Sequence, residues 1–305
     1  MKYTLRQLEV FLAIAGLQNL TRAAESLAMS QSAASSALRE LEQQFGIQLF
    51  DRVGKRLQLN ELGHLIRPRA EALLAQAQDL QRALAGQQQS GLLKVGATLT
   101  IGNYLAVEIM ARYMAAEGHG RVSLEVANTA EIAAKVSNFE IDIGLIEGEL
   151  HHPDIQLSRW QEDELVVFCA PDHPLARQPV LDDQALTAAT WILREPGSGT
   201  RQTFDRALHG LLPQLQVLLE LQHTEAIKRA VEAGLGIGCL SRVTLTEAFR
   251  RGSLIPLAVP HRDFRRHFYF ALHRHKYRSA GIEQWIRLCQ SAAAAESPQA
   301  HDAPA

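Results

Sequence analysis

Residues 30–52 read SQSAASSALRELEQQFGIQLFDR, a run in which small and hydroxyl side chains open an otherwise helical pattern. Ser30 is a favourable N-cap residue, because its side-chain oxygen can accept a hydrogen bond from an N–H of the next turn. Gly46 suits the left-handed position that ends a helix. The pattern therefore predicts a helix that starts near Gln31. One stripe of this helix is apolar, with Ala34, Leu38, Leu41 and Phe45. A different face is short and polar, with Ser32, Ser35, Ser36 and Arg39.

Two helical patterns precede this helix, and two strand-like runs follow it. Apolar residues at helical spacing occupy 5–15 and 20–27, and only two residues separate the second run from Ser30. Two short helices joined by so tight a turn are typical of a helix-turn-helix. Residues 48–52 and 56–59 have strand character, and the three residues between them suit a turn. The sequence therefore predicts a helix-turn-helix with a wing.

The flat polar face has two possible explanations. A helix rich in serine and alanine is often a tightly packed core helix. Short side chains also let a recognition helix lie deep in the major groove, where hydroxyl and amide groups meet base edges and arginines hold phosphates. The tight turn before the helix and the basic wing after it favour the second explanation. The predicted DNA-binding residues are Gln31, Ser32, Ser35, Ser36, Arg39, Arg52, Lys55 and Arg56.

The whole chain has 305 residues, 47% of them hydrophobic, and a formal net charge of -2. It is therefore long enough for two or three globular domains, and any nucleic-acid partner must be met by a local patch. Its three cysteines, Cys169, Cys239 and Cys289, are far apart and lack CxxC spacing, which suits a reducing compartment. The chain shows neither a signal-peptide pattern nor an apolar run of membrane-spanning length. We expect a cytoplasmic protein with no membrane partner.

From residue 61 to about 88 the chain again has helical spacing. Its apolar residues are separated by alternating threes and fours, the a/d pattern of a coiled coil, which favours pairing with a second copy. Packing within the same chain is the alternative. Pro68 lacks an N–H, so it kinks this helix or shifts its start, and GQQQSG at 86–91 predicts a flexible hinge. The seam positions are Leu62, Ile66, Ala70, Leu73, Ala77, Leu80 and Leu84.

Beyond residue 91 strand-like runs alternate with helical ones. Alternation on this scale predicts open, mostly parallel α/β sheets. The expected strands are 92–97, 122–127, 141–146, 165–170, 191–193, 217–221, 237–240, 254–256 and 268–273.

Ligands of such folds bind beyond the carboxyl ends of strands and at helix N-termini. Four segments occupy that position, namely 97–103, 146–149, 194–201 and 239–242. Each hydroxyl alone is as well explained as an N-cap, but their convergence indicates a site for a small oxyanion. The candidate effector-binding residues are Thr98, Thr100, Glu147, Ser198, Gly199, Thr200 and Ser241.

Glu147 complicates this site, because a carboxylate repels an anion unless one of the two carries a proton. Its presence favours a protonated oxyanion or a ligand with a donor group. A solvated loop glutamate is the alternative.

No catalytic, cofactor or metal site is indicated. PGSGT at 196–200 resembles a phosphate loop. The Lys-Ser/Thr pair that would hold phosphate and magnesium is missing, because Arg201 and Gln202 follow Thr200. GLGIG at 234–238 lies between a helix and a strand, the reverse of the order in a dinucleotide fingerprint. The histidines at 151–152 and 273–275 lack metal-ligand spacing. We therefore expect no cofactor, no metal and no enzymatic activity.

The amino-terminal motifs resemble those of the LysR-type transcriptional regulators. The likeness covers the run from Leu5 to Arg52 and LQLNELG at 57–63, and the chain's length and two-part layout also match. The family often has proline at Ser32 and threonine at Asn60. The matching residues are Ala23, Ala24, Ser30, Gln31, Ser35, Leu41, Glu42, Gly46, Leu49, Phe50, Arg52 and Gly63.

The resemblance implies an α+β protein with a winged helix-turn-helix, a long linker helix that pairs two subunits, and a C-terminal α/β effector domain. That domain would have two subdomains like those of periplasmic solute-binding proteins, with crossings near residues 162 and 266. A tetramer of two dimers is also implied. Some family members sense sulfite or sulfate, and their threonine pair is similar to Thr98 and Thr100.

We therefore predict a ligand-responsive regulator that binds a double-stranded DNA operator and a small anionic effector of the sulfite or sulfate type. An α/β enzyme or a cytoplasmic small-anion-binding protein that uses the same cleft is the alternative. The predicted parts are a DNA-binding domain at 1–60, a linker at 61–90, an effector domain at 91–292 (subdomain I 91–162 plus 266–292, subdomain II 163–265) and a disordered tail at 293–305.

Overall fold

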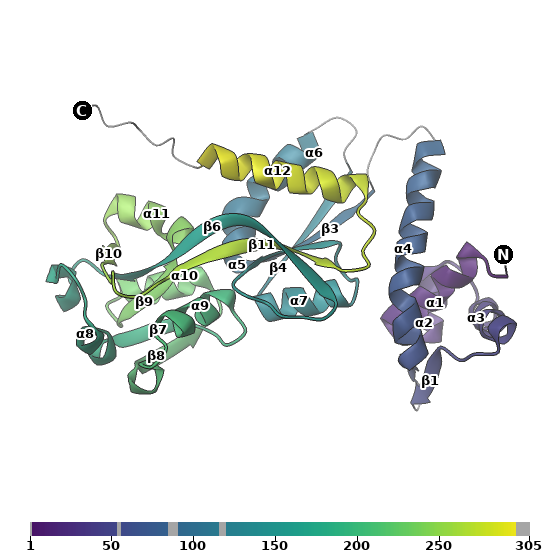
Figure 1. Ribbon diagram of the computed structural model, residues 1–305, viewed down its shortest axis with the longest axis horizontal. Coiled ribbons are helices and arrows are strands. Elements are labelled where there is room, and N and C mark those ends of the chain that lie inside the picture. The colour runs from purple at the N-terminus through teal and green to yellow at the C-terminus, as the bar shows by residue number, and fades with distance from the viewer. Residues whose placement is uncertain (1, 54–55, 85–90, 116–119, 297–305) are drawn as a thin grey trace. The chain divides into compact units, whose positions relative to one another are not determined.

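The chain folds into two compact units in the computed structural model (Figure 1). The first unit comprises residues 1–88 with 275–279, and the second comprises the rest. Among the described helices, none combines the length and the apolar character needed to cross a membrane. The structure describes residues 2–53, 56–84, 91–115 and 120–296.

The first unit is built of helices and one hairpin. Its elements are α1 (Leu5–Leu17), α2 (Leu20–Ser26), α3 (Gln31–Phe45), β1 (Phe50–Val53), β2 (Arg56–Leu59) and α4 (Glu61–Leu84). The predicted helix-turn-helix and wing are therefore present. The N–H of Ala33 donates to Ser30 Oγ at 3.2 Å, and Gly46 ends α3 with a φ of 64°, which confirms both predicted helix boundaries.

Helix α3 packs its apolar stripe into the core of the first unit. Ala34, Leu38 and Leu41 are buried with residues of α1 and α2. The prediction was wrong for Phe45, whose side chain is 47% exposed and contacts only the ring of Tyr3 at 6.3 Å among the ring contacts described. Its position in the last turn of α3 carries it past the edge of the core.

Helix α4 packs within its own chain over its first half, and the predicted pairing with a second copy stays a prediction for its second half. Pro68 lies inside the helix without ending it. Ala70 and Leu74 are buried in the core of the first unit, so the first half of the helix packs within its own chain. Leu80 and Leu84 are 61% and 80% exposed. The predicted hinge from residue 86 lies almost wholly outside the described residues.

The second unit holds a sheet with helices on both faces. Its strands are β3 (Leu93–Thr98), β4 (Val122–Ala127), β5 (Ile143–Glu147), β6 (Ile155–Cys169), β7 (Thr190–Arg194), β8 (Gln216–Leu221), β9 (Ile237–Ser241), β10 (Ile255–Leu257) and β11 (Arg265–His273). Its helices are α5 (Leu99–Ile101), the π-helix η1 (Gly102–Ala106), α6 (Val107–Ala115), α7 (Thr129–Ser137), η2 (Pro174–Arg177), α8 (Asp183–Ala188), α9 (Gly199–Ala207), η3 (Leu212–Gln214), α10 (Thr224–Glu232), α11 (Arg242–Arg251) and α12 (Ala280–Glu296).

Two long antiparallel strands, β6 and β11, join the two halves of this sheet (Figure 1). The strand order is β4-β3-β5-β11-β6-β9-β7-β8, and β10 pairs with β6. Strands β3, β4 and β5 are parallel to one another, as are β7, β8 and β9. The sequence predicted the parallel strands but missed residues 155–164 of β6, because that half of the strand is rich in charged residues and largely exposed.

Separate apolar clusters fill the two halves. One half is centred on β3, β5 and α12, with Trp285 and Tyr113 buried. The other is centred on β6, β7 and β9, with Trp191 and Phe168 buried. The predicted tail needs a correction, because α12 runs through Glu296 instead of ending before residue 293. Alanine has the highest helix propensity, so the alanine-rich run extends the helix.

Candidate functional site

The polar face of α3 is open to solvent in the first unit. Gln31, Ser32 and Ser36 are exposed, and Ser35 is half-buried. Ser32 Oγ lies 3.0 Å from Ser30 Oγ, so the side chain of the second helical residue hydrogen-bonds to that of the N-cap residue. This face therefore presents short side chains and backbone that a groove can approach closely.

Three arginines frame this face. Arg39, Arg52 and Arg56 are exposed, and their side chains make no hydrogen bond or ion pair within the described part of the chain. A shallow hollow of about 290 Å³ lies between α3 and the hairpin and is lined in part by Ser35, Arg39 and Arg52. These guanidinium groups are free to meet phosphate oxygens or guanine. Lys55, also predicted here, lies outside the described residues.

In the second unit, the register brings the predicted effector residues to strand ends. Ala97 of β3 pairs with Leu145 of the parallel strand β5, so Thr98 and Glu147 leave the sheet from neighbouring strands at the same edge. Ser241 ends β9 and pairs with Leu165 of β6. The carboxyl ends of β5 and β9 therefore both meet the crossing strands β6 and β11.

Arg266 of β11 connects these ends. Its Nη2 lies 2.5 Å from Glu147 Oε2, and its Nε donates to Asp163 Oδ2 at 2.6 Å. Its Nη1 donates to Thr200 Oγ1 at 3.0 Å. Ser241 Oγ donates to the other carboxylate oxygen of Asp163 at 2.7 Å. One arginine therefore links two predicted residues directly and a third through Asp163.

The side chains of the network are almost completely buried. Arg266 and Glu147 are each 1% exposed at their side chains, and Asp163 is 2% exposed. Burial lowers the pKa of the Arg266 guanidinium, but the two carboxylates outweigh burial and the net shift is upward. Counted by formal charge, one arginine and two carboxylates leave the triad with one net negative charge. This charge lies at the junction of the two halves.

Ser198 and Gly199 serve the local structure of α9. Ser198 Oγ caps the helix by accepting the N–H of Thr200 at 3.2 Å. The N–H of Gly199 donates to Thr129 Oγ1 at 3.1 Å, across to the other half of the sheet. A Cβ on Gly199 would lie 1.9 Å from Glu147 O, so only glycine allows this approach. The N–H of Gly199, a candidate effector-binding residue, is therefore already used within the protein.

The threonines of the other half retain binding capacity. Thr98 and Thr100 are 1% and 2% exposed. The hydroxyl of Thr98 has no hydrogen-bond partner among the described residues. The structure thus unites Glu147, Thr200 and Ser241 in one network and leaves the Thr98 hydroxyl buried and unpaired. A buried, unpaired hydroxyl is costly, so it is often matched by a ligand or a water.

Sequence reasoning missed Arg266 and Asp163, although each carried a signal. Arg266 alternates with Phe264, Phe268 and Phe270, all buried. Asp163 precedes the buried alternation of Leu165 and Val167. A charged residue in the buried register of a strand predicts a paired, buried charge.

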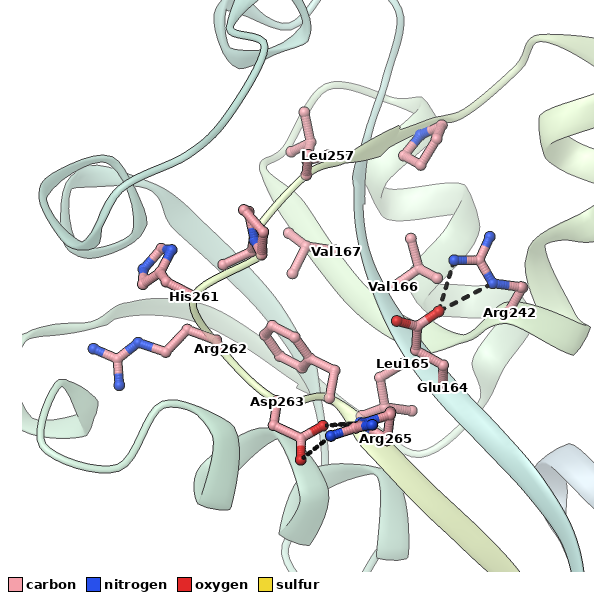
Figure 2. A pocket seen from close by; sticks show the side chains of 15 residues that line it. Glu164, Leu165, Val166, Val167, Arg242, Leu257, His261, Arg262, Asp263 and Arg265 are labelled. Atoms are coloured by element: carbon pink, nitrogen blue, oxygen red, sulfur yellow. Dashed lines mark hydrogen bonds and ion pairs between the residues drawn. The ribbon is translucent and has the colours of Figure 1, made fainter.

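Two surface pockets of the second unit, among those of the described residues, have volumes of about 630 Å³ or more. One, of about 790 Å³, is lined in part by Gly148, Asp163 and Arg266, so it reaches the network from outside. The other has about 630 Å³, and Figure 2 shows Arg242 bound to Glu164 and Arg265 bound to Asp263 around it. None of the seven predicted effector residues lines either pocket. The predicted residues are instead buried, with six of the side chains only 1–2% exposed.

The cysteines offer no reactive thiol. Burial raises the pKa of Cys169 to about 11 and raises those of Cys239 and Cys289 further. At neutral pH these thiols are protonated and poorly nucleophilic. Within the described ranges, no group of three or more His, Cys, Asp or Glu side chains could hold a metal ion.

A helix-turn-helix unit followed by a two-half sheet with an enclosed polar site defines a class, the DNA-binding regulators that carry a ligand-binding domain. Two known protein families match the chain and agree with this class. Residues 5–64 match the model of the bacterial regulatory helix-turn-helix proteins of the lysR family. Residues 86–294 match the LysR substrate binding domain. The chain therefore belongs to the LysR family of transcriptional regulators.

Similar proteins support this assignment over the full length. The uncharacterized HTH-type transcriptional regulator YeiE of Escherichia coli (strain K12) is 45% identical over 292 residues, which cover 96% of this chain and 99% of that protein. A full-length OxyR variant from Pseudomonas aeruginosa has a TM-score of 0.75 and 24% identity, and each chain is covered completely. The CcmR regulatory domain of Synechocystis PCC6803 in complex with 2-PG has a TM-score of 0.61 and 28% identity, covering 67% of this chain and 98% of that domain.

Proposed function

We propose that this LysR-type regulator reads its operator with the polar face of α3 and the wing. Gln31, Ser32, Ser35 and Ser36 contact base edges, and Arg39, Arg52, Lys55 and Arg56 hold phosphates or guanine. The unpaired arginines beside α3 support this assignment. Two subunits pair through the exposed apolar residues of α4, so that each dimer reads two half-sites, and two dimers form a tetramer.

The proposed parts follow the sequence prediction. They are a DNA-binding domain at 1–60, a linker at 61–90 and an effector domain at 91–292 with subdomains that exchange near 162 and 266. The separate apolar clusters of the two halves support this division.

The proposed effector is a small oxyanion held between the two subdomains. Six predicted polar side chains at strand ends and helix starts, drawn from both halves, are each only 1–2% exposed, and this burial is the observation that carries the proposal. They are Thr98, Thr100, Glu147, Ser198, Thr200 and Ser241. An enclosed site of this kind suits a ligand of few atoms.

The charge of the site favours a monoanion. The triad of Arg266, Glu147 and Asp163 carries one net negative charge, which repels a dianion more strongly than a monoanion. A singly protonated oxyanion, of which hydrogen sulfite is the favoured example, also offers a donor to Glu147. The CcmR regulatory domain, which is similar to this part of the chain, was solved in complex with 2-PG, and this supports a small ligand for the domain.

Titration calorimetry of the full-length protein tests this proposal. Sulfite, sulfate, phosphate and acetate are the probes, and sulfite is expected to bind best. Thr98→Val and Thr100→Val should each weaken binding about ten- to a hundredfold, the cost of one hydrogen bond to a charged group. Thr187→Val is the control, because Thr187 donates only to carbonyls of its own helix. If no anion binds the wild-type protein, the oxyanion proposal is wrong.

A further inference from the structure

Two buried polar atoms in the second half of the sheet lack a partner. Arg194 Nη1 and Thr224 Oγ1 make no hydrogen bond within the described part of the chain. Each of the two residues is 2% exposed. A guanidinium N–H and a hydroxyl left in the interior require an acceptor, either water or a ligand.

Arg194 lies on the α10 face of the sheet. Along β7, Trp191 and Leu193 pack into the cluster with α9, whereas Ile192 packs with Ile227 of α10. Side chains alternate between the faces of a strand, so Arg194 points to the same side as Ile192. Arg194 is the last residue of β7 and pairs with Leu221, the last residue of β8.

Helix α10 begins just beyond this edge, since only two residues separate Leu221 from Thr224. Its N-cap residue, His223, makes no side-chain cap hydrogen bond. A helix N-terminus carries partial positive charge and presents free N–H groups. Arg194, Thr224 and this N-terminus therefore place positive charge and donors at one strand end, an arrangement that an anion stabilises.

Glu195 orients the guanidinium without satisfying it. Its carboxylate accepts from Arg194 Nε at 2.8 Å and from Nη2 at 2.9 Å. This bidentate pair fixes the plane of the guanidinium and leaves Nη1 free.

Residues of η1, in the other half of the sheet, contact the first turn of α10. Tyr104 of η1 donates its hydroxyl to Glu225, the second residue of α10, and Lys228 Nζ lies 2.7 Å from the same carboxylate. Thr100 precedes Tyr104 by four residues on the same continuous helix, so it shares the face that meets α10. Thr100 is 2% exposed.

We propose that Arg194 and Thr224 form the cationic half of the effector site. One oxygen of a small monoanion accepts from Arg194 Nη1, and another accepts from Thr224 Oγ1 and the first-turn N–H groups of α10. Thr100 contacts the anion from the opposite wall. This inference rests on the proposed anion-responsive function and adds the residues that supply the positive charge.

Calorimetry of the full-length protein with sulfite, phosphate and acetate tests this assignment. Some variants are expected to weaken anion binding and another to strengthen it. Thr224→Val should weaken binding about tenfold or more, and Arg194→Lys, which loses the fixed guanidinium fork, by a similar factor. Glu195→Gln should strengthen binding about threefold or more, because it leaves Arg194 uncompensated. Arg229→Gln is the control, since Arg229 lies on the same helix with its side chain 77% exposed.

The outcomes separate this inference from the function on which it rests. Anion binding by the wild-type protein, with Thr224→Val weaker and Glu195→Gln tighter, supports the assignment. Wild-type binding that Arg194→Lys and Thr224→Val leave unchanged overturns this inference alone and assigns the two atoms to internal water. Failure of the wild-type protein to bind any of the three anions overturns both.

Discussion

Arg266 is the residue on which the centre of the effector domain depends. It pairs with both Glu147 and Asp163, which reduces the repulsion between these carboxylates and an anion, and it connects β5 to β6. A buried pair of this kind adds little stability compared with an apolar replacement of the whole set. Removal of one partner is different, because it leaves buried charge without compensation.

Arg266→Leu is therefore expected to lower the free energy of unfolding by about 3–5 kcal/mol, because it leaves the buried carboxylates of Glu147 and Asp163 without a counter-charge. Urea unfolding at neutral pH measures the change. Arg265→Leu is the matched control, because its side chain is 80% exposed and pairs only with Asp263. Equal unfolding midpoints for the two variants would show that the network is solvated.

The arginines of the first unit make a second residue-scale prediction. Arg39→Ala should cost about 1–3 kcal/mol of operator binding and relax sequence preference, because Arg39 lies on the face that meets bases. Arg56→Ala, on the wing, should weaken binding to all sequences alike and reduce its salt dependence. Anisotropy titrations at several salt concentrations distinguish the two. Wild-type behaviour in both folded variants would reject the assignment of this surface.

At the scale of elements, a carboxylate of helix α8 pairs with two residues that follow β10. Hydrogen bonds from Arg262 and then His261 lower the pKa of Asp183 below its ordinary value of 3.8. A lowered folded pKa contributes stability that is present above the ordinary value and lost as pH falls through the folded pKa. Asp183 thus anchors α8 to the loop that follows β10 at neutral pH but not in strong acid.

Asp183→Asn should therefore be less stable than the wild-type protein at about pH 7, with the difference shrinking below about pH 4. Urea unfolding across this range measures it. Asp172→Asn serves as the control, because Asp172 is exposed. A difference that grows as the pH falls would have the wrong sign for this ion pair.

The second half of α4 carries the element-scale prediction for assembly. Leu80 is 61% exposed, and we expect it to be covered by the same helix of a second subunit. Leu80→Glu places a charge in that seam and should produce monomers with weak operator binding. Gln78→Glu, on an exposed polar position of the same helix, should leave the oligomer intact. Light scattering that reports the same mass for both variants and the wild-type protein argues against the seam.

At the scale of the whole molecule, local signals made most of the fold predictable. Ser30 and Gly46 mark the ends of α3 because caps depend on the residues beside them. The parallel strands were predictable because each is a short apolar run. The charged half of β6 was not, since its exposed residues hide the alternation.

The effector site was only half predictable. Thr98 and Thr200 stand at recognisable strand and helix ends, but Arg266 and Asp163 are 103 residues apart and meet only through the pairing of β6 with β11. Arg194 and Thr224 likewise share an edge only because β7 and β8 are parallel neighbours. Both pairs of residues are brought together by the pairing of strands that are distant in the sequence, and no single segment encodes that pairing.

The most direct test of the proposed function is a footprint of the full-length protein on the DNA upstream of its own gene, with and without sulfite. We predict protection of two half-sites on successive helical turns, at a pattern or affinity that sulfite alters, and loss of that protection in Arg39→Ala. Protection no stronger than on unrelated DNA, or a specific footprint indifferent to sulfite, phosphate and acetate alike, would contradict an anion-responsive regulator.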